Sequence, residues 1–268
     1  MPIRPLAPAA ALATCMLLLA GCQSGTSSLA SFPGAPLSAA DRDIIDVRAA
    51  LDRPQGNGPF PAVVLLHSCG GVREHLHDWS RFLVERGYAA LVVDTFASRR
   101  LGPCPNGRDP NMMAGLEMVS DAYGALAYLA ARPDIAADRV YVMGFSLGGW
   151  AVRAMATRDP PAGAQGRFRG AIALYAGCME YAGRERLTFP TLVIIGTNDG
   201  RDFPSCDLAA QTRSNRDLDV RIIPGAYHAF DQNPGPQVRQ DMGGRPMRYD
   251  AGAVRLAKTL VEGFLAAR

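Results

Sequence analysis

The chain has 268 residues, of which 48% are hydrophobic and 20% are charged, and its formal net charge is +3. This composition excludes a disordered, strongly charged chain. Lys258 is the only lysine, and the arginines are interleaved with acidic residues, so no basic patch indicates a nucleic-acid partner.

The N-terminal segment has the pattern of an export signal. Arg4 precedes the apolar stretch Ala9–Ala20, which is too short and too rich in alanine for a comfortable membrane-spanning helix. The sequence Leu19-Ala20-Gly21-Cys22 resembles a bacterial lipobox. We therefore expect a signal peptide over residues 1–21 and lipid attachment at Cys22. An ordinary cleaved signal peptide without a lipid is the alternative.

The residues after the expected cleavage site indicate location and domain organisation. Gln23, rather than an aspartate, follows the cysteine, and in lipoproteins of this kind that accompanies sorting to the outer membrane. We expect a protein of the bacterial cell envelope, lipid-anchored and facing the periplasm. Residues 22–40, rich in Ser, Gly and Pro, are predicted to be a flexible tether. Residues 41–268 suit one domain with a single core.

Strand and helix patterns alternate along the remaining chain. Continuous apolar runs between turn residues predict buried strands at Ala62–Leu66, Ala89–Asp94, Val140–Phe145, Gly170–Tyr175 and Thr191–Ile195. A further strand is predicted at Leu218–Ile223, and an edge-like strand at Ile44–Leu51. Helices are predicted at Leu76–Gly87, Met112–Ala131, Leu147–Thr157, Leu208–Arg216 and Ala251–Ala267. This alternation predicts an α/β fold whose mostly parallel sheet has helices on both faces. Functional residues are then expected at the carboxyl ends of the strands.

The turn around Ser146 is the strongest motif. Gly144-Phe145-Ser146-Leu147-Gly148 follows a predicted strand and precedes a predicted helix. In such a G-x-S-x-G turn, glycines allow close packing while the serine hydroxyl is exposed at the top of the sheet. The motif predicts a nucleophilic serine.

An acid and a histidine follow Ser146 in the chain. Asp199 comes just after one predicted strand, and His228 lies in the loop after the next. The order Ser146, Asp199, His228 is that of α/β-hydrolases. A serine hydroxyl needs an imidazole to take its proton, and the imidazole needs a carboxylate to orient it. We therefore predict a catalytic triad.

The loop His67-Ser68-Cys69-Gly70-Gly71 ends an earlier strand. Its small residues would let backbone N–H groups approach an oxyanion, so the amides of Cys69 and Leu147 are the predicted oxyanion-hole donors. We expect His67 to support this loop rather than act as a second base. His75 and His77 are two residues apart and do not share a helix face, so we expect no metal site, and the chemistry needs no cofactor.

These motifs together resemble the dienelactone hydrolase family, over residues 44–267. The resemblance is carried by the 67–71 loop, Asp94-Thr95-Phe96 with Arg99, the turn around Ser146, Gly196-Thr197-Asn198-Asp199 and Tyr227-His228-Ala229-Phe230. It implies an α/β-hydrolase fold and hydrolysis of a small ester or lactone. Arg99 resembles a position that binds a substrate carboxylate, and a solvated loop charge is the alternative. The family's namesake has a cysteine nucleophile and a glutamate where this chain has Ser146 and Ser68, which sets the dienelactone substrate aside.

Four cysteines remain after the predicted signal and lipid site: Cys69, Cys104, Cys178 and Cys206. An even number suits disulfides in an oxidising compartment, and three pairings are open to four cysteines. Each pair, 69 with 104 and 178 with 206, follows neighbouring strands in the expected fold. We therefore predict disulfides Cys69–Cys104 and Cys178–Cys206, both bracing loops around the site.

The sequence thus predicts a membrane-tethered serine hydrolase that acts on a small ester or lactone through an acyl-enzyme. Two alternatives stay open. One is a peptidase of the prolyl oligopeptidase type, which shares the fold and the order of the triad. The other is a binding lipoprotein that keeps the hydrolase fold without catalysis.

Overall fold

The structure is a computed structural model, which describes residues 25–38, 40–41, 43–104, 111–161, 163–181, 186–200, 202–212, 216–233, 237–241 and 244–268. The predicted signal peptide over residues 1–21 and the predicted lipidation site Cys22 lie outside these ranges. Within the described ranges, no helix combines the length and the apolarity that crossing a bilayer requires.

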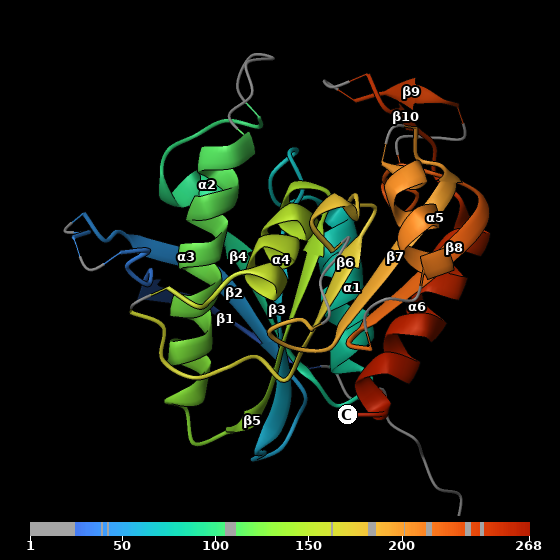
Figure 1. The fold of residues 1–268 in the computed structure, drawn as a ribbon. Coiled ribbons are helices and arrows are strands. Elements are labelled where there is room, and N and C mark those ends of the chain that lie inside the picture. The colour runs from blue at the N-terminus through green and yellow to red at the C-terminus, as the bar shows by residue number, and fades with distance from the viewer. Residues whose placement is uncertain are drawn as a thin grey trace, which may run out of the picture.

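One eight-stranded sheet forms the centre of the fold (Figure 1). Its strands are β1 (Thr26–Pro33), β2 (Asp46–Arg53), β3 (Phe60–Leu66), β4 (Ala89–Asp94), β5 (Ile135–Phe145), β6 (Gly170–Leu174), β7 (Thr191–Asn198) and β8 (Leu218–Tyr227). Their order is β1-β2-β4-β3-β5-β6-β7-β8. β1 pairs antiparallel with β2, β2 pairs antiparallel with β4, and the six strands β3 to β8 run parallel to one another. This confirms the predicted mostly parallel α/β fold.

Helices cover both faces of the sheet, as Figure 1 shows. The helices are α1 (Glu74–Val84), α2 (Thr95–Ser98), α3 (Asn111–Ala130), α4 (Leu147–Thr157), α5 (Phe203–Thr212) and α6 (Ala251–Ala266), with a 3-10 turn, η2, at Met179–Tyr181. The core accordingly has two parts. Residues of α3 and α4 pack with one face of the sheet, and residues of α1 and α6 pack with the other.

The prediction of a flexible tether over residues 22–40 is wrong where this segment forms a strand of the sheet. Thr26–Pro33 forms β1, which pairs with β2 from Thr26↔Arg53 to Pro33↔Asp46 and occupies the edge of the sheet expected for β2. Phe32 is buried and its ring stacks on Tyr128 at 5.3 Å between centroids. Backbone pairing at an edge needs few apolar side chains, so a strand rich in serine was not visible as a hydrophobic pattern. The folded domain therefore begins before residue 41.

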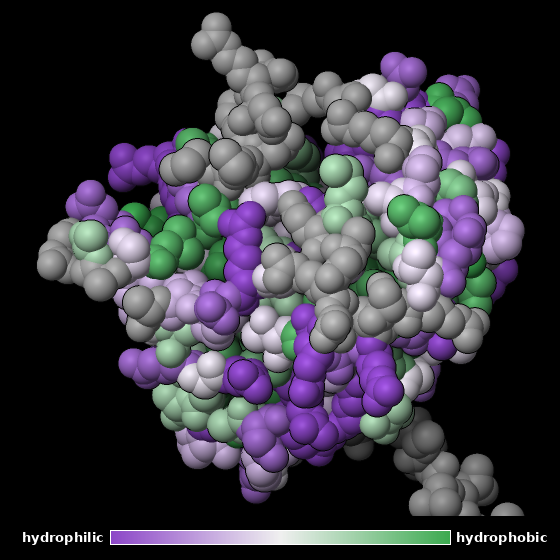
Figure 2. All heavy atoms as spheres, in the orientation of Figure 1, coloured by the Kyte–Doolittle hydropathy of each residue, from purple (hydrophilic) through white to green (hydrophobic). Residues whose placement is uncertain are grey.

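A short hairpin was also not predicted. β9 (Arg239–Gln240) and β10 (Pro246–Met247) pair with each other and lie above the carboxyl ends of β7 and β8 in Figure 1. An isolated bridge joins Met247 to His228, which fixes the hairpin beside the loop after β8. On the face seen in Figure 2, hydrophilic and apolar side chains are intermixed.

Candidate active site

The turn between β5 and α4 holds Ser146 in a rare backbone conformation. Its φ is 53° and its ψ is −106°, outside the regions that most residues with a side chain adopt. Close packing maintains it: a Cβ on Gly148 would lie 2.2 Å from the carbonyl oxygen of Leu66, and one on Gly144 would lie 2.1 Å from that of Gly148. The two glycines are therefore required for this turn, as the motif predicted.

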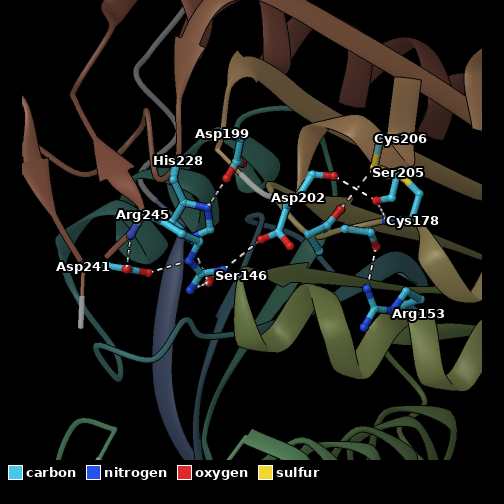
Figure 3. Close-up of polar contacts among 12 residues, drawn as sticks. Ser146, Arg153, Cys178, Asp199, Asp202, Ser205, Cys206, His228, Asp241 and Arg245 are labelled. Carbon is cyan, nitrogen blue, oxygen red and sulfur yellow. Dashed lines mark hydrogen bonds and ion pairs between the residues drawn. A yellow bond between two sulfur atoms is a disulfide. The ribbon is translucent and has the colours of Figure 1, made fainter. Parts of the chain in front are cut away.

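The three residues of the predicted triad come together (Figure 3). Oγ of Ser146 lies 3.0 Å from Nε2 of His228, and Nδ1 of His228 lies 2.7 Å from Oδ1 of Asp199. A carboxylate oxygen can only accept here, so Nδ1 carries the proton and Nε2 accepts from the serine hydroxyl. Asp199 follows β7 and His228 follows β8, at the carboxyl edge of the parallel strands. This arrangement can move a proton from the serine to the imidazole.

Burial is the largest influence on the pKa of Asp199. Asp199 is 0% exposed and His228 is 2% exposed. Burial raises the pKa of Asp199 above its ordinary 3.8, and the hydrogen bond from His228 and the charge of that imidazole act against this rise. Asp199 is thus a buried carboxylate whose main side-chain partner is the imidazole of His228.

An aromatic cluster lies beside the histidine. The ring of Tyr175 packs on that of His228 at 5.0 Å between centroids, and its hydroxyl donates to Oδ1 of Asp231 at 2.9 Å. Nε1 of Trp79 donates to Oδ2 of the same carboxylate at 2.8 Å. Asp231 therefore holds Tyr175, and through it one side of the imidazole. No motif in the sequence indicated this cluster.

Arg245 also reaches the site. It precedes β10, and its Nη2 lies 3.4 Å from Oγ of Ser146. Its Nε donates to Oδ2 of Asp241 at 2.6 Å, and its Nη1 donates to Oδ2 of Asp202 at 3.1 Å. Burial opposes the charge of Arg245, but the carboxylates of Asp241 and Asp202 outweigh it and raise the pKa. No sequence motif indicated this arginine, because it lies in the β9–β10 hairpin, which was not predicted.

The 67–71 loop lies where the oxyanion-hole prediction placed it, between β3 and α1. The amide of Gly71 donates to the carbonyl of Ser68 at 3.0 Å, which closes a tight turn. The amide of Gly148, the residue after Leu147, donates to the carbonyl of His67 at 3.2 Å and joins the loop to the start of α4. The amides of Cys69 and Leu147 thus lie on adjoining segments, and their role as oxyanion donors stays a prediction.

Three histidines lie outside the predicted triad: His67 and His75 are buried, and His77 is exposed. Nδ1 of His67 donates to the carbonyl of Ser68 at 2.7 Å, and the ring packs on Phe96, which fits the expected supporting role. Burial lowers the pKa of His67 and of His75. His75 is buried while His77 is exposed, so the two point to different surroundings, as the spacing predicted.

Both predicted disulfides are confirmed. Cys69–Cys104 joins the 67–71 loop to the segment after α2, and Cys178–Cys206 joins the segment after β6 to α5. Beside the second disulfide, the amide of Cys178 donates to Oγ of Ser205, whose hydroxyl donates to the carbonyl of Asp202. Figure 3 shows that this chain of contacts leads to the carboxylate held by Arg245.

The structure gives Arg99 a different role from the predicted binding of a substrate carboxylate. Its Nη1 and Nη2 each donate to Asp121 at 2.8 Å, and its Nε lies 3.5 Å from Glu117. Each nitrogen of the guanidinium faces a carboxylate of α3, and Asp121 is fully buried. Arg99 therefore serves as an ion-pair partner inside the fold, because α3 supplies carboxylates that sequence spacing does not reveal.

Carboxylates and the imidazole gather closely enough to be compared with a metal site. Ligand atoms of Asp199, Asp202 and His228 lie within 4.8 Å of one another. However, Nδ1 of His228 is bonded to Asp199, and the cationic Arg245 is bonded to Asp202. The nitrogen of His228 and the carboxylate of Asp202 are therefore already engaged, and the positive charge of Arg245 nearby disfavours a bound metal cation.

Known proteins resemble this chain along nearly its whole folded part. The model of the "Dienelactone hydrolase family" matches residues 47–267. The "Probable 2-oxo-3-(5-oxofuran-2-ylidene)propanoate lactonase" of a Bradyrhizobium species is 25% identical over 205 residues, which cover 69% of this chain and 79% of that protein.

Solved structures share the fold. The dienelactone hydrolase from Anabaena variabilis superposes with a TM-score of 0.60 at 18% identity and covers 91% of this chain and 98% of its own. A dienelactone hydrolase-like promiscuous phosphotriesterase from metagenomic libraries superposes with a TM-score of 0.67 at 19% identity, covering 91% of this chain and 99% of its own. With most of its length matched by the family model, the chain belongs to the dienelactone hydrolase family of α/β-hydrolases.

Proposed function

We propose that this hydrolase is a serine esterase or lactonase that cleaves a small carboxylic ester or lactone through an acyl-enzyme. The observation that carries the proposal is the continuous hydrogen-bond chain from Ser146 through His228 to Asp199, which starts at a serine held at φ 53°. The family membership supports hydrolysis, and the lactonase name of the Bradyrhizobium relative is consistent with a lactone.

The geometry supports a two-step reaction. Nε2 of His228 takes the hydroxyl proton of Ser146 as Oγ attacks the substrate carbonyl carbon. When the tetrahedral intermediate collapses, the leaving oxygen takes that proton from Nε2, and the acyl group stays on Oγ. A water molecule then gives a proton to the same imidazole and attacks the acyl carbon. When this second intermediate collapses, the bond from the acyl carbon to Oγ breaks, Oγ takes the proton back from Nε2, and the acid is released. Asp199 keeps the proton on Nδ1 and balances the charge that the imidazole gains.

The oxyanion of both intermediates needs N–H donors close to Oγ. We assign these to the backbone amides of Cys69 and Leu147, as the motifs suggested. The assignment is supported by the hydrogen bond between Gly148 and His67, which holds the two segments together, and by the Cys69–Cys104 disulfide, which braces the loop. Such donors act through preorganisation, so a braced loop suits the role.

A fluorophosphonate probe tests the nucleophile directly. The wild-type protein should be labelled once and the Ser146→Ala variant should not. Ser27→Ala, on the exposed edge strand β1, is the control and should label like the wild type. Peptide mapping of the adduct to residue 146 would support the proposal, as would hydrolysis of aryl esters and lactones by the wild type and Ser27→Ala but not by Ser146→Ala.

Other results would favour the alternatives. Folded wild type that neither labels nor hydrolyses any ester would favour a binding protein with a hydrolase fold. Labelling at Ser146 combined with cleavage of peptide substrates and inertness toward esters would favour a peptidase.

We further propose that the mature protein is lipid-anchored through Cys22 in the bacterial envelope, facing the periplasm. The lipobox-like sequence and the two disulfides support this, since disulfides persist in oxidising compartments. Because β1 begins at Thr26, few residues separate Cys22 from the domain. A span of four residues reaches at most roughly 14 Å, which would hold the domain close to the membrane surface.

Metabolic labelling with a radioactive fatty acid tests the anchor. The wild-type chain should incorporate the label and fractionate with membranes, whereas Cys22→Ala should do neither. A wild-type chain that is processed without label would show an ordinary cleaved signal peptide instead.

A further inference from the structure

Among the described residues, Arg245 is a charged side chain outside the proposed triad that lies against the proposed nucleophile Ser146. Its Nη2 lies 3.4 Å from Oγ of Ser146, and the side chain is only 17% exposed. Its backbone is held beside the loop after β8, and its guanidinium is held by two carboxylates. The amide of His228 donates to the carbonyl of Pro246 at 3.1 Å, directly after Arg245 in the chain. The arginine is therefore held by the same loop that carries the catalytic histidine.

Two carboxylates hold the rest of the guanidinium. Asp241 accepts from Nε and Asp202 accepts from Nη1, so the plane of the group is set and Nη2 is directed at the serine. Figure 3 shows this arrangement, with Arg245 between the two acids and Ser146. A guanidinium held in this way loses little additional side-chain entropy when it donates a further hydrogen bond.

The chemistry of the guanidinium determines the direction of the contact. An arginine can only donate hydrogen bonds, so Oγ of Ser146 accepts from Nη2. The hydroxyl proton of the serine is then left to point at Nε2 of His228, which is the orientation that proton transfer requires. As Oγ loses that proton, negative charge grows on the atom that Nη2 already contacts.

We propose, on the basis of the proposed serine hydrolase function, that Arg245 is a further catalytic residue whose Nη2 orients the Ser146 hydroxyl and stabilises charge on Oγ during attack. In this step the proton passes from Oγ to Nε2 of His228, the bond from Oγ to the substrate carbonyl carbon forms, and the carbonyl π electrons move to its oxygen. Arg245 keeps its protons throughout and exchanges none with the substrate.

The same contacts argue against a clamp for an anionic substrate. Bidentate binding of a carboxylate uses two donors on one edge of the guanidinium. Here the Nε and Nη1 positions are occupied by Asp241 and Asp202, whose charges also offset that of the arginine. The free direction of Nη2 offers a donor to one oxygen at the reacting centre. Arg245 should therefore assist neutral and anionic esters alike.

The test compares Arg245→Ala, Arg245→Lys and the wild type on 4-nitrophenyl acetate and on the anionic mono-4-nitrophenyl succinate. Loss of a charge-assisted hydrogen bond predicts that Arg245→Ala lowers kcat by about 10- to 100-fold on both esters with little change in KM. Guanidinium chloride at low millimolar concentration should restore part of the rate of Arg245→Ala, and sodium chloride should not. Arg239→Ala, an exposed position on β9 of the same hairpin, is the matched control and should keep wild-type kcat.

Thermal unfolding of each variant separates catalysis from folding. If Arg245→Ala does not fold, Arg245→Lys decides, because it keeps the charge but cannot bridge three partners, and its kcat should fall on both esters. Unchanged kcat in a folded variant would overturn the inference, as would a loss limited to the KM of the anionic ester. Wild type that is inert to both esters and to the fluorophosphonate would overturn the proposed function and this inference with it, whereas an active wild type with unaffected Arg245 variants overturns this inference alone.

Discussion

The ring of Tyr175 packs edge-on against the imidazole of His228, with 5.0 Å between the ring centroids. Tyr175 is fully buried, and its φ of 41° is positive, like that of Ser146. Its hydroxyl is bonded to Asp231, three residues after the histidine. One carboxylate thus connects the segment after β6 with the segment that carries His228, and both flank the site.

Tyr175→Phe should lower stability more than catalysis. The ring is kept, but Oδ1 of Asp231 loses the hydroxyl donor inside the fold, which predicts a free energy of unfolding lower by about 1–3 kcal/mol. Urea unfolding measures this. Tyr227→Phe, half-buried with its ring under Arg248, is the control and should change the free energy by less than about 0.5 kcal/mol. Equal losses in both variants would contradict a special role for the bond to Asp231.

A pair of glycine substitutions tests the packing of the serine turn. The Cβ of Gly148→Ala would lie 2.2 Å from the carbonyl oxygen of Leu66 and 2.9 Å from that of His67. Backbone atoms cannot rotate away, so we expect a loss at or above the upper end of the ~1–3 kcal/mol typical of overpacking, together with loss of esterase activity. Thermal unfolding and an aryl ester assay measure both effects.

Gly263→Ala is the matched control. Gly263 lies within α6, and a Cβ there meets nothing within 4 Å. Because alanine is favoured over glycine inside helices, this variant should gain about 0.5–1 kcal/mol and keep full activity. A Gly148→Ala protein as stable and active as Gly263→Ala would show that the segments joined at the turn can separate without cost.

Much of the fold could be predicted from the sequence where burial dictates the side chains. Ala89–Asp94 and Leu147–Thr157 have the predicted bounds, since one is a strand apolar on both faces and the other begins at a serine turn. β1 could not be predicted, because its pairing with β2 uses backbone groups and buries little besides Phe32. Each strand of the β9–β10 hairpin has only two residues, too few for any periodic pattern.

The ion pair of Arg99 offers a test of its corrected role. Arg99→Met would leave the buried carboxylate of Asp121 without its bidentate partner, which predicts a loss of about 3–5 kcal/mol in stability. KM for an anionic ester should stay at the wild-type value in protein that remains folded. In Arg221→Met, the control, an exposed pair with Asp219 is lost at a cost of at most about 1 kcal/mol. A raised KM for the anionic ester with unchanged stability would instead restore the original prediction of substrate binding.

Within the site, the residues of the proposed triad could be predicted because each directly follows a strand whose local pattern predicts it, at the carboxyl edge of the sheet. Arg245 could not, because its contact with Ser146 depends on the bridge between His228 and Met247, which no local pattern encodes. The failure of the Arg99 prediction has the same cause. Its partners lie on α3, and which face of that helix meets α2 is decided by packing.

The pH dependence of stability should distinguish the acid of the triad from an acid of the arginine network. Burial raises the pKa of Asp199 above 3.8, so ionising this group is unfavourable in the folded state. Its contribution to stability is complete below about pH 3.8 and is lost as pH rises through the raised pKa. Asp199→Asn removes that loss. Relative to wild type, the variant should therefore be more stable at pH 7 than at pH 4.

Asp241→Asn should behave in the opposite way. Burial opposes ionisation of Asp241 as well, but the backbone amide and the charge of Arg245 outweigh it and lower the pKa below 3.8. That stabilisation is present above about pH 3.8 and is lost as pH falls through the lowered pKa, so the variant should be destabilised at pH 7 and less so in acid. Urea unfolding of wild type and both variants between pH 3 and pH 8 measures the two trends. The esterase activity of Asp199→Asn is a second measurement. Its kcat should fall on the order of 10⁴-fold, because the side-chain amide at position 199 cannot hold the imidazole of His228 in the required tautomer. Parallel pH trends in the two variants would contradict the assignment of burial as the dominant effect at Asp199 and ion pairing as the dominant effect at Asp241.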